Sequence, residues 1–281
     1  MPYCHIHTDR ETGRSCTRCG RPACPACLHD AAVGAHCTSC VIAARGPASQ
    51  QLKRKVRTVT TTLFPATKVL IALNAVVFVL SQAKVQAFNN GHLGIYAYAV
   101  SHGDWWRIVT SGFAHVNLVH IGFNMYALYA LGQAMERQLG SSRFVGVYVV
   151  SLLGGSFGAI LFEPRALAVG ASGAVFGLFG AMAMAMRQRG MSVMKSPLGP
   201  TLLINFVLTF AIPGIAIGGH IGGFIFGGLA GGALLNPRKL GDTKKQDVAV
   251  LAGLAVLAVV LTLYFARHGV NGGRGLWPRN S

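Results

Sequence analysis

The sequence has 281 residues, of which 52% are hydrophobic and only 12% are charged. Soluble globular domains carry about 25% charged residues, so this composition excludes an ordinary soluble protein and predicts a polytopic membrane protein. The formal charge of +17 comes from 25 Lys and Arg against eight Asp and Glu. Because these charges lie between apolar runs, they indicate positive-inside loops facing a lipid bilayer, and we expect no nucleic-acid partner.

Four regions are predicted along the chain. Residues 1–41 form a Cys/His module, and residues 42–62 form a basic linker. Residues 63–236 are expected to form a core of six membrane helices. Residues 237–281 then supply a cytoplasmic loop, a seventh transmembrane helix and an external tail. All seven cysteines lie before residue 41, so disulfide bonds cannot cross-link the membrane part.

The N-terminal module contains eight candidate metal ligands in four pairs, with two residues between the members of each pair. The pairs are Cys4 and His7, Cys16 and Cys19, Cys24 and Cys27, and Cys37 and Cys40. One tight turn can aim both members of a pair at the same tetrahedral ion, and eight ligands suffice for two Zn²⁺ ions. A segment of about 40 residues cannot build a sufficient hydrophobic core, so we expect structural zinc to stabilise it.

Disulfide bonds are the alternative use of these cysteines, but a cytoplasmic location and an odd number of cysteines disfavour them. Spacing alone leaves open which pairs share an ion, and whether His5 or His36 replaces a neighbouring ligand. Because every position on such zinc ions would be filled, no water site remains for catalysis. The module is therefore expected to be a binding or regulatory appendage, with a cytoplasmic protein as its candidate partner.

Apolar runs that can cross a hydrocarbon core recur after residue 65. Roughly 20 residues of helix span a core of about 30 Å. The predicted helices are 66–83, 116–135, 143–162, 171–187, 199–213, 217–235 and 247–266. Pro213 and Gly214 end the fifth run, so the turn before the sixth must be tight. The predicted fold is an all-α, polytopic membrane helical bundle preceded by the small zinc-binding module.

Lys and Arg are concentrated in alternate loops, which predicts the orientation of the chain. The basic loops are 53–57, 137–143, 187–195 and 238–245. The positive-inside rule then gives a cytoplasmic N-terminus, seven spans and an extracytoplasmic C-terminus in the plasma membrane. The segment 84–115 lies outside and is expected to be a partly inserted loop. Trp105 and Trp106 within it are suited to the membrane interface.

Several polar residues within the predicted spans are candidates for acyl-transfer chemistry. Ser172 is a candidate nucleophile and His220 a candidate base, and intramembrane histidines are functional candidates by default. His120 and Asn124 lie four residues apart and so share one helix face, where both can donate hydrogen bonds to an oxyanion. No Asp or Glu lies deep enough in a span to orient the base. A Ser-His dyad is therefore expected rather than a triad, and an aspartyl protease is excluded.

Glycines favour the close approach of two of these helices. They are Gly219, Gly223, Gly227 and Gly231 on helix 217–235, and Gly173 and Gly177 on helix 171–187. Small residues every four positions let two helix backbones pack closely. Packing alone explains the glycines, but it does not explain why each glycine face carries one reactive residue. The glycines therefore predict that Ser172 and His220 are brought within hydrogen-bond reach.

Over roughly residues 65–236 the chain resembles the rhomboid family of intramembrane serine proteases. The matching motifs are Gly-x-Ser-Gly at 170–173, Gly219-His220, Trp106-Arg107, and His115, His120 and Asn124. The resemblance implies that Ser172 is the nucleophile and His220 the general base. It also implies that His120 and Asn124 line the oxyanion hole. Phe176 falls where the family has an aromatic ring packing on the catalytic histidine, and the seventh helix looks like an addition to a six-helix core.

The N-terminal module is outside this likeness and resembles a B-box zinc finger. In that cross-braced type, alternate pairs of ligands share a metal ion. The resemblance implies that Cys4, His7, Cys24 and Cys27 form one site. It implies that Cys16, Cys19, Cys37 and Cys40 form the other.

These likenesses predict an intramembrane serine endopeptidase that cleaves transmembrane segments of membrane proteins and needs no cofactor for catalysis. A catalytically inactive rhomboid-like protein that binds membrane clients is the first alternative. A transporter with a zinc-sensing domain is the second. It would be expected to show internal repeats and charged residues within its spans, and the sequence has neither.

Overall fold

The computed structural model describes residues 2–31, 34–45, 64–196, 198–211, 216–236 and 244–269. The chain divides into two compact units, Met1–Leu63 and Phe64–Ser281. Most of the predicted linker 42–62, the turn at Pro213 and Gly214, the loop 237–243 and the tail after residue 269 lie outside the described residues.

The first unit is a small module with little regular secondary structure. It contains η1 (Pro25–Cys27), the antiparallel hairpin of β1 (Leu28–Asp30) and β2 (Ala35–Cys37), and α1 (Thr38–Arg45). Its buried cluster consists of cysteines and Ala23, without large apolar side chains. So small an apolar core cannot stabilise a fold by itself, which leaves the grouped cysteines as the natural source of stability.

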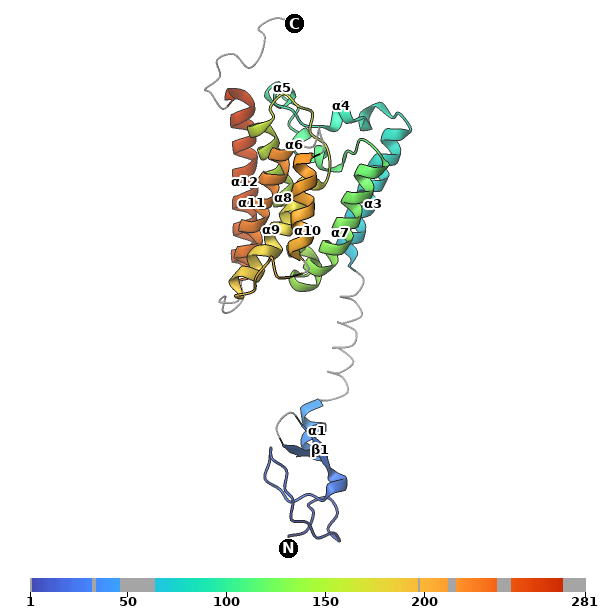
Figure 1. Ribbon diagram of the computed structural model, residues 1–281, viewed down its shortest axis with the longest axis vertical. Coiled ribbons are helices and arrows are strands. Elements are labelled where there is room, and N and C mark those ends of the chain that lie inside the picture. Colours follow the sequence, from blue (N-terminus) through green and yellow to red (C-terminus); the bar gives the residue numbers. More distant parts are fainter. Residues whose placement is uncertain are drawn as a thin grey trace, which may run out of the picture. The chain divides into compact units, whose positions relative to one another are not determined.

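The second unit is a bundle of long helices (Figure 1). They are α3 (Pro65–Gln82), α7 (Leu118–Leu139), α8 (Ser141–Phe162), α9 (Ser172–Gln188), α10 (Leu198–Ala211), α11 (Ile217–Leu234) and α12 (Lys244–His268). Each described boundary lies within four residues of the predicted one. The predicted all-α membrane bundle, with six core helices and one added at the C-terminal side, is confirmed.

Four of these helices, α3, α8, α11 and α12, are long and apolar enough to cross a membrane by length and composition alone. Seven spans were predicted. Two of the other three helices are shorter than a span, since α9 has 17 residues and α10 has 14. Helix α7 has 22 residues but carries polar and charged side chains, Glu136 and Arg137 among them.

The segment between α3 and α7 folds into short helices at one end of the bundle (Figure 1). They are η2 (Gln86–Phe88), α4 (Asn90–Leu93), α5 (Ala97–Ser101), α6 (Arg107–Thr110) and η3 (Ser111–Phe113). The guanidinium of Arg107 stabilises this region by donating to Asp104 and to the carbonyls of Gly91 and Gly94, at 2.6 to 2.8 Å. The predicted loop is thus a compact set of helical turns.

Helix α8 lies at the centre of the bundle and α12 at its edge. In α8, 72% of the most apolar stretch is buried, against 11% in α12. Helix α12 packs along α8, where Arg143 Nε lies 2.8 Å from the buried carboxylate of Asp247. At the same end of the bundle, Glu136 of α7 accepts hydrogen bonds from residues that begin α3 and α8. These polar contacts position the helices that carry the site.

Candidate active site

Ser172 is the first residue of α9 and follows a tightly held turn. Gly170 has φ +125°, a conformation that strains any residue with a side chain. Its N–H donates to the carbonyl of Ser111 at 2.9 Å, and Ala168 exchanges two backbone hydrogen bonds with Ile95. The loop before Ser172 is therefore fixed by the segment between α3 and α7, which determines the position of the serine at the start of α9.

Helices α9 and α11 touch through their glycines, as predicted. A Cβ added at Gly173 would lie 3.3 Å from the carbonyl oxygen of Gly219, and one at Gly223 would clash with the backbone of Gly173. One turn further along, Gly227 meets Gly177 in the same way. Ser172 and His220 are the sequence neighbours of Gly173 and Gly219, so both candidate catalytic residues lie at this helix contact.

The imidazole of His220 is buried and held on two sides. Its ring stacks on Phe176, with centroids 4.0 Å apart and planes 13° apart. Its Nδ1 lies 2.8 Å from Oγ1 of Thr209 on α10. The Phe176 ring lies where the resemblance placed it, whereas Thr209 was not foreseen from the sequence.

His120 reaches the turn before Ser172 from α7, and Asn124 lies one helical turn further along the same helix. A Cβ added at Gly170 would lie 2.7 Å from Nε2 of His120 and 3.6 Å from Oγ of Ser172, so these two atoms flank the same point. Asn124 is buried, and its Nδ2 donates to the carbonyl of His120 at 2.9 Å. An amide nitrogen carries two hydrogens, so Asn124 keeps a second donor for an oxyanion.

His115 lies beside His120, with ring centroids 5.0 Å apart, and is fully buried. Its Nδ1 is 3.2 Å from the carbonyl of Phe113, which can only accept, so Nδ1 donates. Its Nε2 can then accept from the N–H of Ala171, 3.5 Å away. His115 thus supports the backbone immediately before Ser172 and is not itself placed to react.

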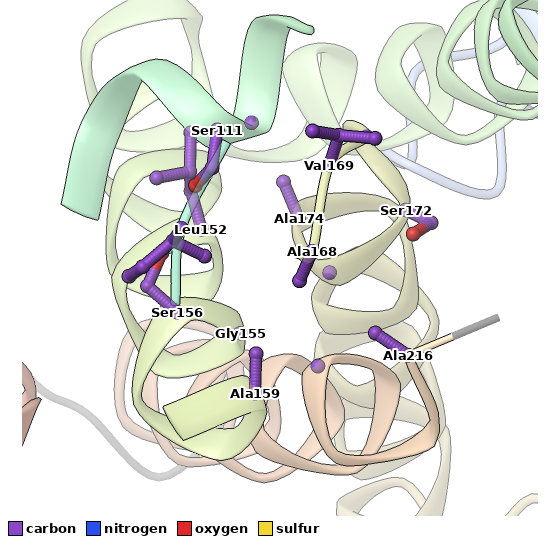
Figure 2. A pocket seen from close by; sticks show the side chains of 15 residues that line it. Ser111, Leu152, Gly155, Ser156, Ala159, Ala168, Val169, Ser172, Ala174 and Ala216 are labelled. Atoms are coloured by element: carbon purple, nitrogen blue, oxygen red, sulfur yellow. The ribbon is translucent and has the colours of Figure 1, made fainter. Parts of the chain in front are cut away.

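A pocket with a volume of about 40 Å³ lies beside Ser172 (Figure 2). Its lining includes Leu152 and Ser156 of α8, Ser111 of η3, and Val169 and Ser172 on the opposite side. A cavity needs roughly 10–15 Å³ of such volume to hold one water molecule. The pocket can therefore hold water next to the serine hydroxyl, which a hydrolytic site requires.

Glu163, the residue after α8, reaches the start of the helix that carries His220. Both of its carboxylate oxygens lie 3.3 Å from the N–H of Gly218. The residue before α11 is Ala216, whose side chain cannot cap the helix. The carboxylate supplies the missing acceptor and a charge that suits a helix N-terminus.

The first unit brings its candidate ligands into two groups. One contains Cys4, His7, Cys24 and Cys27, and the other contains Cys16, Cys19, Cys37 and Cys40. In each group the ligand atoms lie within 4.8 Å of one another. Sγ of Cys19 and Sγ of Cys37 are 3.8 Å apart, the separation that two thiolates about 2.3 Å from one tetrahedral zinc would have. All seven cysteines are free, and the grouping is the cross-braced one.

The thiols of each group differ in their affinity for protons. Burial raises the pKa of Cys16, but hydrogen bonds from backbone N–H groups outweigh it and lower this pKa to about 5. The same competition lowers the pKa of Cys4 to about 6. Burial raises the pKa of Cys27 to about 11, and a hydrogen bond with Cys19 raises that of Cys40 to about 12. Each group therefore offers a thiolate at neutral pH, and the donor set fits zinc.

Residues 102–237 match the family model of the rhomboid domain. The chain is 34% identical over 209 residues to Rhomboid protease GluP of Bacillus subtilis (strain 168), a match that covers 72% of this chain and 40% of that protein. It is 32% identical over 181 residues to Rhomboid-like protease 1 of Toxoplasma gondii, which covers 61% of this chain and 60% of the relative. RHOMBOID-like protein 6, mitochondrial, of Arabidopsis thaliana is 34% identical over 144 residues, covering 48% of this chain and 46% of the relative. The chain thus spans less than two thirds of each of these relatives.

Proposed function

Because its rhomboid domain and its rhomboid protease relatives support membership of the rhomboid family, we propose that this chain is an intramembrane serine endopeptidase with a Ser172–His220 dyad. The observation that supports the proposal is the contact of Gly173 with Gly219, because Ser172 and His220 are the sequence neighbours of these two glycines at the starts of α9 and α11. The substrates are transmembrane segments of other membrane proteins, which reach the site from the bilayer.

In the proposed mechanism the hydroxyl of Ser172 attacks the scissile carbonyl while Nε2 of His220 takes its proton. The negative charge that develops on the carbonyl oxygen is stabilised by three donors: Nε2–H of His120, the free N–H of Asn124 and the backbone N–H of Ser172. His220 then returns the proton to the leaving amine. Water from the adjacent pocket hydrolyses the acyl-enzyme, with His220 again acting as the base.

We assign the first unit a structural role with two Zn²⁺ ions, held in the two groups of four ligands. When bound, zinc cross-links loops that bury too little apolar surface to be stable alone. We also propose the division of the chain into four regions, with a basic linker at 42–62. We propose a multi-pass topology in the plasma membrane, with the N-terminus in the cytoplasm, where a protein partner binds the module.

Separate substitutions of Ser172→Ala and His220→Ala test the proposal. Each is expected to abolish cleavage of a single-span reporter in proteoliposomes, and Ser172→Ala to abolish labelling by a fluorophosphonate. Ser156→Ala is the control, since Ser156 lines the same pocket but donates to the carbonyl of Ile108 at 2.7 Å. Cleavage by either dyad variant at the wild-type rate would contradict the proposal. A wild-type chain that the probe does not label would instead be an inactive rhomboid-like protein.

A further inference from the structure

The stack of Phe176 on His220 fixes the plane of the imidazole but not its orientation within that plane. Rotation of the histidine by 180° about χ2 keeps the plane and exchanges Nδ1 with Cδ2 and Nε2 with Cε1. Only one of the two orientations presents a nitrogen toward the serine. In the other orientation a carbon atom takes that place, and it cannot accept a proton. A second contact is needed to select the productive orientation.

Thr209 of α10 supplies such a contact at the opposite edge of the ring. Its Oγ1 lies 2.8 Å from Nδ1 of His220, and both side chains are buried, with 3% and 6% exposure. In the flipped ring, Cδ2 would face this hydroxyl and the hydrogen bond would be lost. Loss of a buried hydrogen bond costs free energy, so the bond favours the orientation that points Nε2 away from α10.

The hydrogen bonds of Thr209 also determine which nitrogen carries the proton. Oγ1 of Thr209 lies 2.7 Å from the carbonyl of Asn205, which can only accept, so the single hydroxyl proton is donated there. The hydroxyl must then accept from His220, which places the proton on Nδ1. A neutral imidazole carries one N–H, so Nε2 keeps the lone pair that a general base needs.

We propose that Thr209 is a positioning residue for the base, which selects both the ring orientation and the Nδ1–H tautomer of His220. This inference rests on the proposed dyad. In this role the neutral hydroxyl of Thr209 orients the base, as a carboxylate does in a catalytic triad. Phe206, one helical turn before Thr209 on α10, packs edge-on against Phe176 at 5.3 Å, so the same helix supports both contacts to the imidazole.

The test compares Thr209→Val, which keeps the shape of the side chain, with Thr209→Ser, which keeps the hydroxyl. The readout is the rate of fluorophosphonate labelling of Ser172 in the full chain. We expect Thr209→Val to lower this rate about tenfold, equivalent to about 1.4 kcal/mol, and Thr209→Ser to restore most of it. For reporter cleavage, kcat should fall with little change in KM, because Thr209 contacts the base and not the substrate.

Thr262→Val on α12 is the matched control. Thr262 is also fully buried and donates to the carbonyl four residues earlier, Ala258, at 2.7 Å, but it does not contact His220. Both valine variants should unfold at similar temperatures, whereas only Thr209→Val should label slowly. Labelling of Thr209→Val at the wild-type rate, or of Thr209→Ser as slowly as Thr209→Val, would overturn the proposal.

A measurement on the wild-type chain needs no variant of Thr209. In [15N]histidine-labelled protein, the His220 signals are those lost in His220→Ala, and they should show a protonated Nδ1 and an unprotonated Nε2. The reverse tautomer would overturn the positioning role even if the dyad is correct. A wild-type chain that neither labels nor cleaves would contradict the proposed function, while the tautomer would still report on Thr209.

Discussion

Gly173 of α9 and Gly219 of α11 face each other so closely that a Cβ on the first would lie 3.3 Å from the carbonyl oxygen of the second. The neighbouring residues in the chain are Ser172 and His220. Both residues therefore lie where two helix backbones are in contact, without a side chain between the two glycines.

Gly223→Ala should separate the two helices. The new methyl group would overlap the backbone of Gly173, which cannot rotate away as a side chain could. Overpacking of this kind costs about 1–3 kcal/mol, and we expect cleavage to be lost together with part of the thermal stability. Gly253→Ala is the control, because nothing lies within 4 Å of a Cβ at that position of α12. The prediction fails if the two variants have the same activity.

Asn124→Ala should lower kcat by about 10²–10³-fold, the usual effect of removing one oxyanion donor. The KM of the reporter should change little, because the donor acts on charge that develops in the transition state. Asn74→Ala controls for the structural part of the change. Asn74 is also buried and donates to the carbonyl four residues earlier, at 2.8 Å, but it lies on α3. Equal losses of kcat in both variants would argue against an oxyanion role.

His120→Ala should slow fluorophosphonate labelling and lower kcat, again by about 10²–10³-fold. Nε2 of His120 and Oγ of Ser172 flank the same point near Gly170, where the oxyanion is expected. His92→Ala is the control, since His92 lies in the external segment and packs against Trp106, with ring centroids 5.7 Å apart. Unchanged kcat in His120→Ala would remove this residue from the proposed oxyanion hole.

Glu136→Ala should destabilise the bundle without impairing the chemistry of the molecules that remain folded. The carboxylate accepts hydrogen bonds from two backbone N–H groups and two hydroxyls, at 2.6 to 3.0 Å, and so joins the starts of α3 and α8 to α7. Donors left without a partner cost about 1–3 kcal/mol each, and we expect a loss of about 3 kcal/mol. Thermal unfolding in detergent measures the loss, and probe labelling per folded molecule should be unchanged.

Purified protein should contain two zinc ions per chain, and a strong chelator should expose the first unit to proteolysis. Zinc binding at pH 7 should release protons, because the pKa values of Cys27 and Cys40 are raised to about 11 and about 12. Binding should therefore weaken as the pH falls, since protons compete with zinc for these thiols. Calorimetry in buffers with different ionisation enthalpies counts the protons released.

Two histidine variants test which residues bind the zinc. His7→Ala should reduce the zinc content to about one ion, because Nδ1 of His7 lies 3.2 and 3.5 Å from two thiols of its group. His36→Ala should keep both ions, since His36 pairs with His29 across the β1–β2 hairpin and belongs to neither group. Loss of zinc in the second variant alone would mean that the ligand set is wrong.

The sequence predicts the long helices well, because each coincides with a largely apolar run, although among the described helices only α3, α8, α11 and α12 are long and apolar enough to cross a membrane. It also predicts the close contact of α9 with α11, since glycines at every fourth position of the two helices face each other. The pairing of Ser172 with His220 stays a prediction. The cross-braced grouping of the cysteines followed from a likeness to a known zinc finger. Spacing alone left that grouping open, because turns of the same length serve either arrangement.

Other contacts depend on how helices pack and could not be read from the chain. Thr209 is one of three polar residues on the otherwise apolar helix α10, and its partner becomes evident only when α10 lies against α11. The segment 84–115 has no helical periodicity, because its short turns are stabilised by distant groups such as the guanidinium of Arg107. The capping of α11 by Glu163 could not be predicted either, since this helix begins more than 50 residues after Glu163.

The carboxylate of Glu163 has a consequence for how the site withstands distortion of the bundle. Eight residues, 164–171, connect Glu163 to Ser172, and Glu163 itself accepts from the start of the helix that bears His220. A displacement of α11 along its axis would therefore pull on the connection that leads to the serine. The segment before Ser172 and the helix of His220 are thus linked twice, by this carboxylate and by the glycine contact of α9 with α11.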